Sequence, residues 1–356
     1  MLYAGYMCAV CSGAIVSDRR HKIPQRSQYL ITGGAGFIGS HLVEAIVARG
    51  AQVTVLDDLS TGLERNLDAL AAEPALRLVE GSVTDAELVD RLMAQCDHCL
   101  HLASAVGVEL VVADPLHTLR QIVQGTDVVL AAAAAHRPRL VFFSTSEVYG
   151  KNSGQFLHED SDRLLGSASK SRWSYAIAKS YGESLAHGYH RQHGTDTVIV
   201  RLFNTIGPRQ RSSYGMVVPR FVQRALAGED LRVYGDGSQS RCFMHVGDAV
   251  RAILAVCDAT GATGRAFNIG NPRPITILDL ARRVIELTGS DSGISLVPYE
   301  EAYGDGFEEL GRRSPDITAI SELTGWRPRR TLDEALSDVI AVQRDHASAG
   351  GVRVRA

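Results

Sequence analysis

A tyrosine and a lysine four residues apart, Tyr175 and Lys179 in SYAIAKSYGESLAHGYHRQHG, could carry out acid–base chemistry. In a helix this spacing places both side chains on one face. A phenol with a pKa of about 10 is a poor base at neutral pH, but a nearby positive charge favours the phenolate and lowers that value. The pair could then take the proton of a hydroxyl group while hydride leaves the same carbon. By itself the spacing also occurs by chance in many helices.

A third residue, Thr145, could orient the reacting hydroxyl group. It lies in RLVFFSTSEVYG, whose first part is a continuous apolar run that predicts a buried strand. Thr145 stands at the carboxyl end of that strand, where doubly wound folds bind their ligands. Thr145, Tyr175 and Lys179 are therefore expected to form one redox site.

A glycine-rich turn near the start of the chain predicts a dinucleotide site. In ITGGAGFIGSHL, glycines 34, 36 and 39 satisfy G-x-G-x-x-G, and glycines 33, 36 and 39 satisfy an evenly spaced variant. Small residues let the backbone turn tightly and approach a pyrophosphate at the N-terminus of the next helix. The residues expected to contact the cofactor are Gly33, Gly36, Phe37, Ile38 and Gly39, together with Tyr175 and Lys179.

An acidic residue, Asp57, ends the next predicted strand, QVTVLD. Its distance from the glycines is close to the spacing of about 20 residues typical of the carboxylate that binds the adenine ribose. A negative charge there repels a 2′-phosphate, so the predicted cofactor is NAD and not NADP. The alternative is an acid that only caps the strand end.

The elements that must position these residues alternate between strand-like and helix-like segments from residue 28 to about 205. Continuous apolar strands separated by helices indicate a parallel sheet covered on both faces, which is a doubly wound α/β fold of the Rossmann type. Beyond residue 205, Gly, Pro and polar residues cluster, and the elements become shorter. We expect a poorly ordered extension at 1–27, an NAD-binding domain at 28–205 to which the chain returns around 243–272, and a smaller C-terminal α/β substrate-binding lobe at 206–345.

Composition sets further bounds on function. The chain has 356 residues, 45% hydrophobic and 22% charged, with a formal net charge of −3. This balance gives no electrostatic reason to expect nucleic acid or a membrane surface as partner, and no segment reaches the ~18 consecutive apolar residues of a membrane span.

Two C-x-x-C pairs, Cys8/Cys11 and Cys96/Cys99, could hold zinc. Because Cys99 falls in a predicted buried strand and Cys8 in the extension, we expect no metal site, and a cytoplasmic enzyme fits.

Five segments together resemble the extended short-chain dehydrogenase/reductases that modify nucleotide sugars: TGGAGFIGSHL, STSEVYG, SYAIAK, RLFNTIGPR and VYGDGSQSRCFMHVGDAV. The resemblance runs from about residue 28 to 340. It implies bound NAD, a catalytic set of Thr145, Tyr175 and Lys179, and a C-terminal lobe that binds a nucleoside diphosphate sugar. It also implies a homodimer formed through the helices predicted at 115–135 and 174–193.

The resemblance implies oxidation at sugar C4, and Glu147 narrows the reaction that follows. UDP-galactose 4-epimerases usually lack a carboxylate there, whereas UDP-glucuronate decarboxylases and GDP-mannose 4,6-dehydratases have Thr-Ser-Glu, as here. TDP-glucose 4,6-dehydratases have Asp-Glu instead. The segments SRCF with Arg241, RWSYAIAK and FNIGNP resemble the decarboxylase domain of the lipid A aminoarabinose pathway. A UDP-glucuronate decarboxylase is therefore the favoured function, in which Arg241 and Glu147 handle the carboxylate and the enolate left after its loss.

Other interpretations remain open at this point. The enzyme could be a 4-epimerase of the UDP-glucose/UDP-galactose type or a 4,6-dehydratase, and a non-enzymatic NAD-binding sensor is a third class. Arg241 could instead contact the pyrophosphate, as is common in the family. The sequence also departs from the family in having Gly81-Ser82 where Gly-Asp is frequent, and Ile122 where Asn is frequent.

The resemblance also assigns residues to the substrate. They are Asn204, Phe221 beside the base, Tyr234, Arg241, and Arg313 as a diphosphate contact. Phe221 and Tyr234 could equally be core aromatics, and Arg313 could be a solvated surface charge.

Overall fold

Seven parallel strands form the central sheet of the computed structural model, which describes residues 27–104, 114–212, 216–299, 301 and 312–350. The predicted extension, apart from Ser27, and the Cys8/Cys11 pair lie outside these residues. The strand order is β11-β6-β5-β4-β1-β2-β3. In chain order the strands are β1 (Gln28–Thr32), β2 (Gln52–Asp57), β3 (Leu76–Glu80), β4 (His98–His101), β5 (Arg139–Thr145), β6 (Thr197–Leu202) and β11 (Ala266–Ile269).

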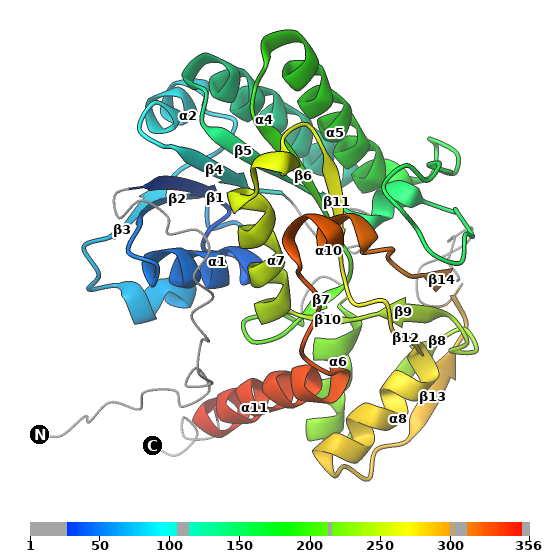
Figure 1. The fold of residues 1–356 in the computed structure, drawn as a ribbon. Coiled ribbons are helices and arrows are strands. Elements are labelled where there is room, and N and C mark those ends of the chain that lie inside the picture. Colours follow the sequence, from blue (N-terminus) through cyan, green and yellow to red (C-terminus); the bar gives the residue numbers. More distant parts are fainter. Residues whose placement is uncertain (1–26, 105–113, 213–215, 300, 302–311, 351–356) are drawn as a thin grey trace, which may run out of the picture.

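Helices cover both faces of this sheet (Figure 1). On one face lie α1 (Phe37–Val47) and α7 (Val246–Asp258), with α10 (Thr318–Thr324) beside them. On the other face lie α2 (Ala86–Met93), α4 (Pro115–His136) and α5 (Ser174–His193), which pack against one another in that order. The predicted doubly wound α/β fold is confirmed.

The apolar strands in the middle of the sheet, β1, β4, β5 and β6, are largely buried, whereas β3 at its edge has no buried residue. In β5, five consecutive residues are buried, as a sheet covered on two faces requires. Two helices begin or end where the sequence indicates. Asp85 caps the start of α2 by accepting a hydrogen bond from the Leu88 amide, and Gly194 ends α5 with a left-handed φ of 66°. This packing fixes the carboxyl ends of the strands, where the predicted site residues lie.

The switch point of the sheet lies between β1 and β4, because the strand order reverses there. The glycine turn follows β1, and Ser104 follows β4. Doubly wound folds bind ligands outside the strand ends at such a point. The topology therefore places the glycine turn beside the predicted ligand-binding site, at the carboxyl ends of β1 and β4.

A second lobe with its own hydrophobic core lies beside the sheet (Figure 1). Its parallel pair is β8 (Leu231–Tyr234) with β13 (Ile294–Val297), and its three-stranded sheet has β9 (Ser240–Cys242) between β12 (Pro274–Thr276) and β14 (Arg312–Arg313). The helices α6 (Val217–Leu226), α8 (Ile277–Thr288) and α11 (Leu332–Gly350) pack together here.

Short elements connect the two parts. The strands β7 (Thr205–Ile206) and β10 (Met244–His245) pair in parallel, and after α7 the chain adds β11 to the main sheet beside β6. Among the described residues there are also the short 3-10 helices η2 (Glu64–Leu70), η3 (Ser146–Tyr149), η4 (Ser171–Trp173) and η5 (Thr260–Ala262). In the part of the chain that the structure describes, no helix combines the length and the apolar character needed to span a bilayer.

Candidate active site

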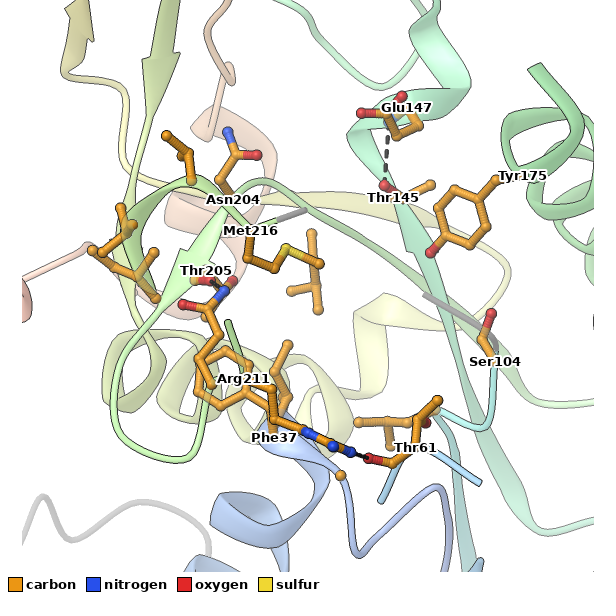
Figure 2. A pocket seen from close by; sticks show the side chains of 18 of the residues that line it. Phe37, Thr61, Ser104, Thr145, Glu147, Tyr175, Asn204, Thr205, Arg211 and Met216 are labelled. Atoms are coloured by element: carbon orange, nitrogen blue, oxygen red, sulfur yellow. Dashed lines mark hydrogen bonds between the residues drawn. The ribbon is translucent and has the colours of Figure 1, made fainter. Parts of the chain in front are cut away.

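One cavity of about 1160 Å³ is lined by residues of both lobes. Every residue that the sequence assigns to cofactor, catalysis or substrate lines it: Gly33, Gly36, Phe37, Ile38, Gly39, Asp57, Thr145, Glu147, Tyr175, Lys179, Asn204, Phe221, Tyr234, Arg241 and Arg313. Figure 2 shows part of this cavity, with side chains from β5, α5 and the second lobe pointing into it. The structure therefore brings together residues that are up to 280 positions apart in the chain (from Gly33 to Arg313).

The glycine turn has no room for side chains at Gly33 and Gly39. Gly33 has φ +74°, and a Cβ on it would lie 2.8 Å from the amide nitrogen of Ala103. A Cβ on Gly39 would collide with the carbonyl oxygen of Gly33, so α1 can approach the turn only with glycine there. Gly36 is the N-cap of α1, whose first turn carries no acidic residue. These features fit the pyrophosphate of a dinucleotide.

Asp57 stands at the end of β2 with only 6% of its surface exposed. Its two carboxylate oxygens accept hydrogen bonds from the amides of Ala35 (2.9 Å) and Leu59 (3.0 Å). Burial raises the pKa of Asp57, and these two amides oppose the effect. The carboxylate is thus held rigidly beside the glycine turn, as the predicted contact to a ribose requires.

The predicted redox residues converge from α5 and β5. The Lys179 ammonium donates to the carbonyl oxygen of Phe143 at 2.8 Å and lies 5.9 Å from the centre of the Tyr175 ring. The Thr145 hydroxyl accepts a hydrogen bond from the Glu147 amide at 3.2 Å. In Figure 2, Tyr175, Thr145 and Ser104 surround one part of the cavity, and the Ser104 hydroxyl points toward the phenol.

The protein's own groups do not make Tyr175 acidic. Burial, followed by the negative charge of Glu147, raises the pKa of Tyr175 above its usual value, while the neighbouring hydroxyls of Ser104 and Thr145 oppose the shift. Burial also lowers the pKa of Lys179 to about 7. The prediction that Lys179 lowers the pKa of Tyr175 is therefore wrong for the protein alone, because the phenol is desolvated and Lys179 is directed to a carbonyl group. The positive charge of an oxidised nicotinamide, if bound beside the ring, would favour the phenolate.

Glu147 lies between two arginines. Arg172 contacts it at 2.7 Å, and Arg313 forms a second ion pair from the other lobe. Although burial disfavours its charge, the two arginines hold the pKa of Glu147 at about 2. Arg172 comes from η4, just before Tyr175, so this cluster joins the start of α5 to β14.

The substrate residues occupy the second-lobe side of the cavity. Arg241 of β9 pairs in register with Arg313 of β14, and Asn204 donates to the carbonyl oxygen of Cys242 at 3.2 Å. Phe221 is 3% exposed and belongs to the core of the second lobe while also lining the cavity. Arg313 is buried and not a solvated surface charge; its visible partner is Glu147, and its diphosphate role stays a prediction.

Many residues that line the cavity were not singled out from the sequence, and three of them bear on the site. Ser104 lies three residues after the end of β4, and the rule that ligands bind at strand carboxyl ends could have indicated it. Arg172 was noted only as part of a resemblance. Arg211 donates to the carbonyl oxygen of Thr61 at 3.1 Å, which links the loop after β7 to the loop after β2 (Figure 2). No local pattern marks Arg211.

Positive charge predominates around the cavity. The carboxylates that line it are Asp57, Asp58, Asp114, Glu147 and Glu229, whereas the cations are Lys179 and the arginines 172, 209, 211, 220, 224, 232, 241 and 313. Such an excess favours an anionic ligand. Within the described residues, no three His, Cys, Asp or Glu side chains are grouped as a metal site would require, and Cys99 is buried in β4.

Residues 29–270 match the NAD dependent epimerase/dehydratase family. The chain belongs to this family. Its glycine turn and Asp57 fit the family's dinucleotide, and the predicted cofactor, NAD, is confirmed at the level of the family. The predicted membership of the extended short-chain dehydrogenase/reductases is confirmed as well.

Curated relatives include decarboxylases of nucleotide sugars. The chain is 41% identical to a UDP-N-acetyl-alpha-D-glucosaminuronate decarboxylase of Bacillus cytotoxicus over 88% of this chain and 97% of the relative. It is 35% identical to UDP-glucuronic acid decarboxylase 1 of Xenopus tropicalis, over 88% of this chain and 72% of that protein.

A solved structure supports the fold. A dTDP-glucose 4,6-dehydratase of Streptomyces venezuelae, crystallised with NAD, superposes with a TM-score of 0.82 at 31% identity. The match covers 90% of this chain and 98% of the dehydratase.

Proposed function

We propose that this protein is an NAD-dependent decarboxylase of a UDP-hexuronate, with UDP-glucuronate or its 2-acetamido counterpart as substrate. The observation that carries the proposal is the cluster of Arg172, Glu147 and Arg313 next to Tyr175, with Arg241 beside Arg313. A guanidinium group binds a carboxylate through two parallel hydrogen bonds. The names of the curated relatives support a uronate substrate.

The proposed reaction begins with oxidation at sugar C4. Tyr175 takes the proton of the C4 hydroxyl, and Thr145 orients that hydroxyl. The glycine turn and Asp57 would hold NAD⁺, which would accept the hydride from C4. The product is a β-keto acid, in which the C5–C6 bond can break so that carbon dioxide leaves and its electron pair moves to the C4 oxygen as an enolate. Arg241 is proposed to bind the carboxylate and then to stabilise the enolate, since an arginine is almost never deprotonated. Protonation of this enolate at C5 then gives the 4-keto product.

The test is to incubate the purified protein with UDP-glucuronate, with UDP-N-acetylglucosaminuronate and with UDP-glucose. Carbon dioxide release, with a product lighter by one carbon dioxide, is expected from one or both uronates and not from UDP-glucose. A product of unchanged mass and inverted C4 would instead show a 4-epimerase. Loss of water from UDP-glucose would show a 4,6-dehydratase, and the absence of any reaction would favour an NAD-binding sensor.

The domain roles are also proposals. Residues 28–205 are proposed to bind NAD, and 206–345 to bind most of the nucleotide sugar, because the glycine turn and Asp57 lie in the first range and Arg241 and Arg313 in the second. The protein is proposed to act in the cytoplasm, on a small nucleotide sugar and not on nucleic acid or membranes. Detection of the labelled protein in separated cell fractions checks the location.

We further propose a homodimer formed through α4 and α5. Leu116, Ile177 and Tyr181 on these helices are 57%, 39% and 40% exposed, which is high for large apolar side chains. Ile177→Glu is expected to convert the dimer to a monomer in sedimentation velocity. A wild-type protein that sediments as a monomer would contradict the proposal.

A further inference from the structure

A buried carboxylate that does not line the cavity, Glu183, lies one helical turn after Lys179 on α5. It is 0% exposed. Arg201 of β6 binds it with two hydrogen bonds, from Nε to Oε1 at 2.9 Å and from Nη2 to Oε2 at 2.7 Å. The Ser144 hydroxyl and the Arg163 guanidinium donate to it as well. A carboxylate so fully partnered inside the protein is costly to bury and fixes several elements at once.

The partners of Glu183 lead directly to the redox residues. Ser144 is the residue before Thr145 on β5, and Ser144 pairs in register with Arg201 on β6. Lys179 is on the same face of α5 as Glu183. Glu183 therefore ties together the helix that carries Tyr175 and Lys179 and the strand end that carries Thr145.

The groups around Lys179 differ in their effect on its charge. From β4, His101 is buried and neutral, with its pKa lowered to about 3 by burial and then by Lys179. From β5, the Phe143 carbonyl oxygen accepts a hydrogen bond from the Lys179 ammonium. On α5, Tyr175 lies beside it, and Glu183 raises the pKa of Lys179 against the effect of burial.

We propose that Glu183 is a positioning residue for proton transfer by Tyr175, which fixes Lys179 and, through Ser144, Thr145. The proposal rests on the redox site of the proposed function, but not on the identity of the sugar. Glu183 acts on Lys179 by its charge and on Thr145 by its contact with Ser144. These two actions can be separated by substitution.

The first test is Glu183→Gln, which keeps the shape and removes the charge. The pKa of Lys179 is expected to fall by about one unit, because a nearby negative charge favours the ammonium form. The titration of Lys179 can be followed without substrate by NMR of protein labelled with ¹⁵N-lysine. The chain has only four lysines, 22, 151, 170 and 179, and loss of one NMR signal in Lys179→Met assigns that signal to Lys179. The alkaline limb of the kcat–pH profile should move to lower pH by the same amount. Glu183→Asp, which restores the charge, should recover most of this shift.

The matched control is Glu159→Gln. Glu159 belongs to the same hydrogen-bond network as Glu183. Its carboxylate accepts a hydrogen bond from the Asn268 backbone amide, and its carbonyl oxygen accepts one from Arg201. It is not among the groups that shift the pKa of Lys179. We expect this variant to lose thermal stability with the Lys179 titration unchanged. If Glu183→Gln behaves in the same way, the charge role is overturned.

The second test is Ser144→Ala, which also serves if Glu183→Gln fails to fold. This variant keeps the ion pair between Glu183 and Arg201 and removes the hydrogen bond from the Ser144 hydroxyl on β5 to Glu183. We expect kcat to fall about tenfold with KM unchanged, since a misplaced Thr145 affects the transition state more than binding. A wild-type kcat would overturn the positioning role. If the wild-type protein decarboxylates no uronate, the proposed function fails, whereas the lysine titration still decides the inference.

Discussion

Two carboxylates at the two ends of the cavity, the buried Asp57 and the half-buried Glu147, have pKa values shifted in opposite directions. Asp57 is held by neutral backbone amides, and burial raises its pKa. Glu147 is held by Arg172 and Arg313, and its pKa falls to about 2. Burial alone thus does not decide the charge of a group; the charge of its partners does.

The same contrast separates the two ends of the site as a whole. The dinucleotide end is made of backbone from one short segment, 33–39, with Asp57 on the neighbouring strand. The sugar end is made of side chains from η3, η4, β9 and β14. A site built from backbone depends on the absence of side chains, whereas one built from side chains depends on the packing of distant segments.

The largest expected effect belongs to the sugar end. Tyr175→Phe removes the proton acceptor and should lower kcat by about 10³-fold, within the range that a general acid–base group contributes. Bound NAD should be retained, because the glycine turn is untouched, and absorbance of NAD released on denaturation measures it. A variant with near wild-type turnover would remove Tyr175 from the mechanism.

Arg172→Met should break the charge balance around Glu147. Loss of one partner of a buried ion pair costs roughly 3 kcal/mol, which urea unfolding at pH 7 would show. Because the folded pKa of Glu147 is depressed, its stabilising effect is present above its ordinary value of 4.5 and is lost as pH falls toward 2. The variant should therefore lose less stability than the wild type between pH 4.5 and 2.

The control for this prediction is Arg282→Met. Arg282 pairs with Asp279 on the surface, with both side chains more than half exposed. The expected change is much smaller than for Arg172→Met, because solvent screens an exposed ion pair. An equal loss in the two variants would mean that Glu147 is not stabilised by its buried partners.

Gly39→Ala tests the backbone character of the dinucleotide end. The added Cβ collides with the Gly33 carbonyl oxygen, so the free energy of unfolding should fall by about 2 kcal/mol and NAD should bind less tightly. Gly188→Ala is the matched control, since a Cβ at Gly188 on α5 meets nothing within 4 Å. That variant should gain up to about 1 kcal/mol, because alanine favours the helix. Equal NAD affinity in both variants would show that the turn does not hold the pyrophosphate.

The smallest expected effect is a change of cofactor preference. Asp57→Asn removes the charge that repels a 2′-phosphate, so the ratio of NAD to NADP affinity should fall by about tenfold, or roughly 1.4 kcal/mol. Fluorescence titration of the two dinucleotides measures the ratio. An unchanged ratio would mean that Asp57 only braces the loop through the Ala35 and Leu59 amides.

The sequence by itself determined the parallel sheet, the glycine turn and the Thr145–Tyr175–Lys179 set. These features depend on local periodicity or on the end of one strand, and such patterns are visible without knowing what packs where. The sequence also supplied Glu147, but only through a resemblance.

Only the tertiary structure decided the partners of these groups. It placed Arg313 of β14 against Glu147, directed Lys179 to the Phe143 carbonyl oxygen, and set Glu183 between Ser144 and Arg201. Ion pairs and desolvation depend on distances between segments that the chain order does not specify. For this reason most residues of the site could be predicted from the sequence, whereas Arg172 and the charge states of the site could not.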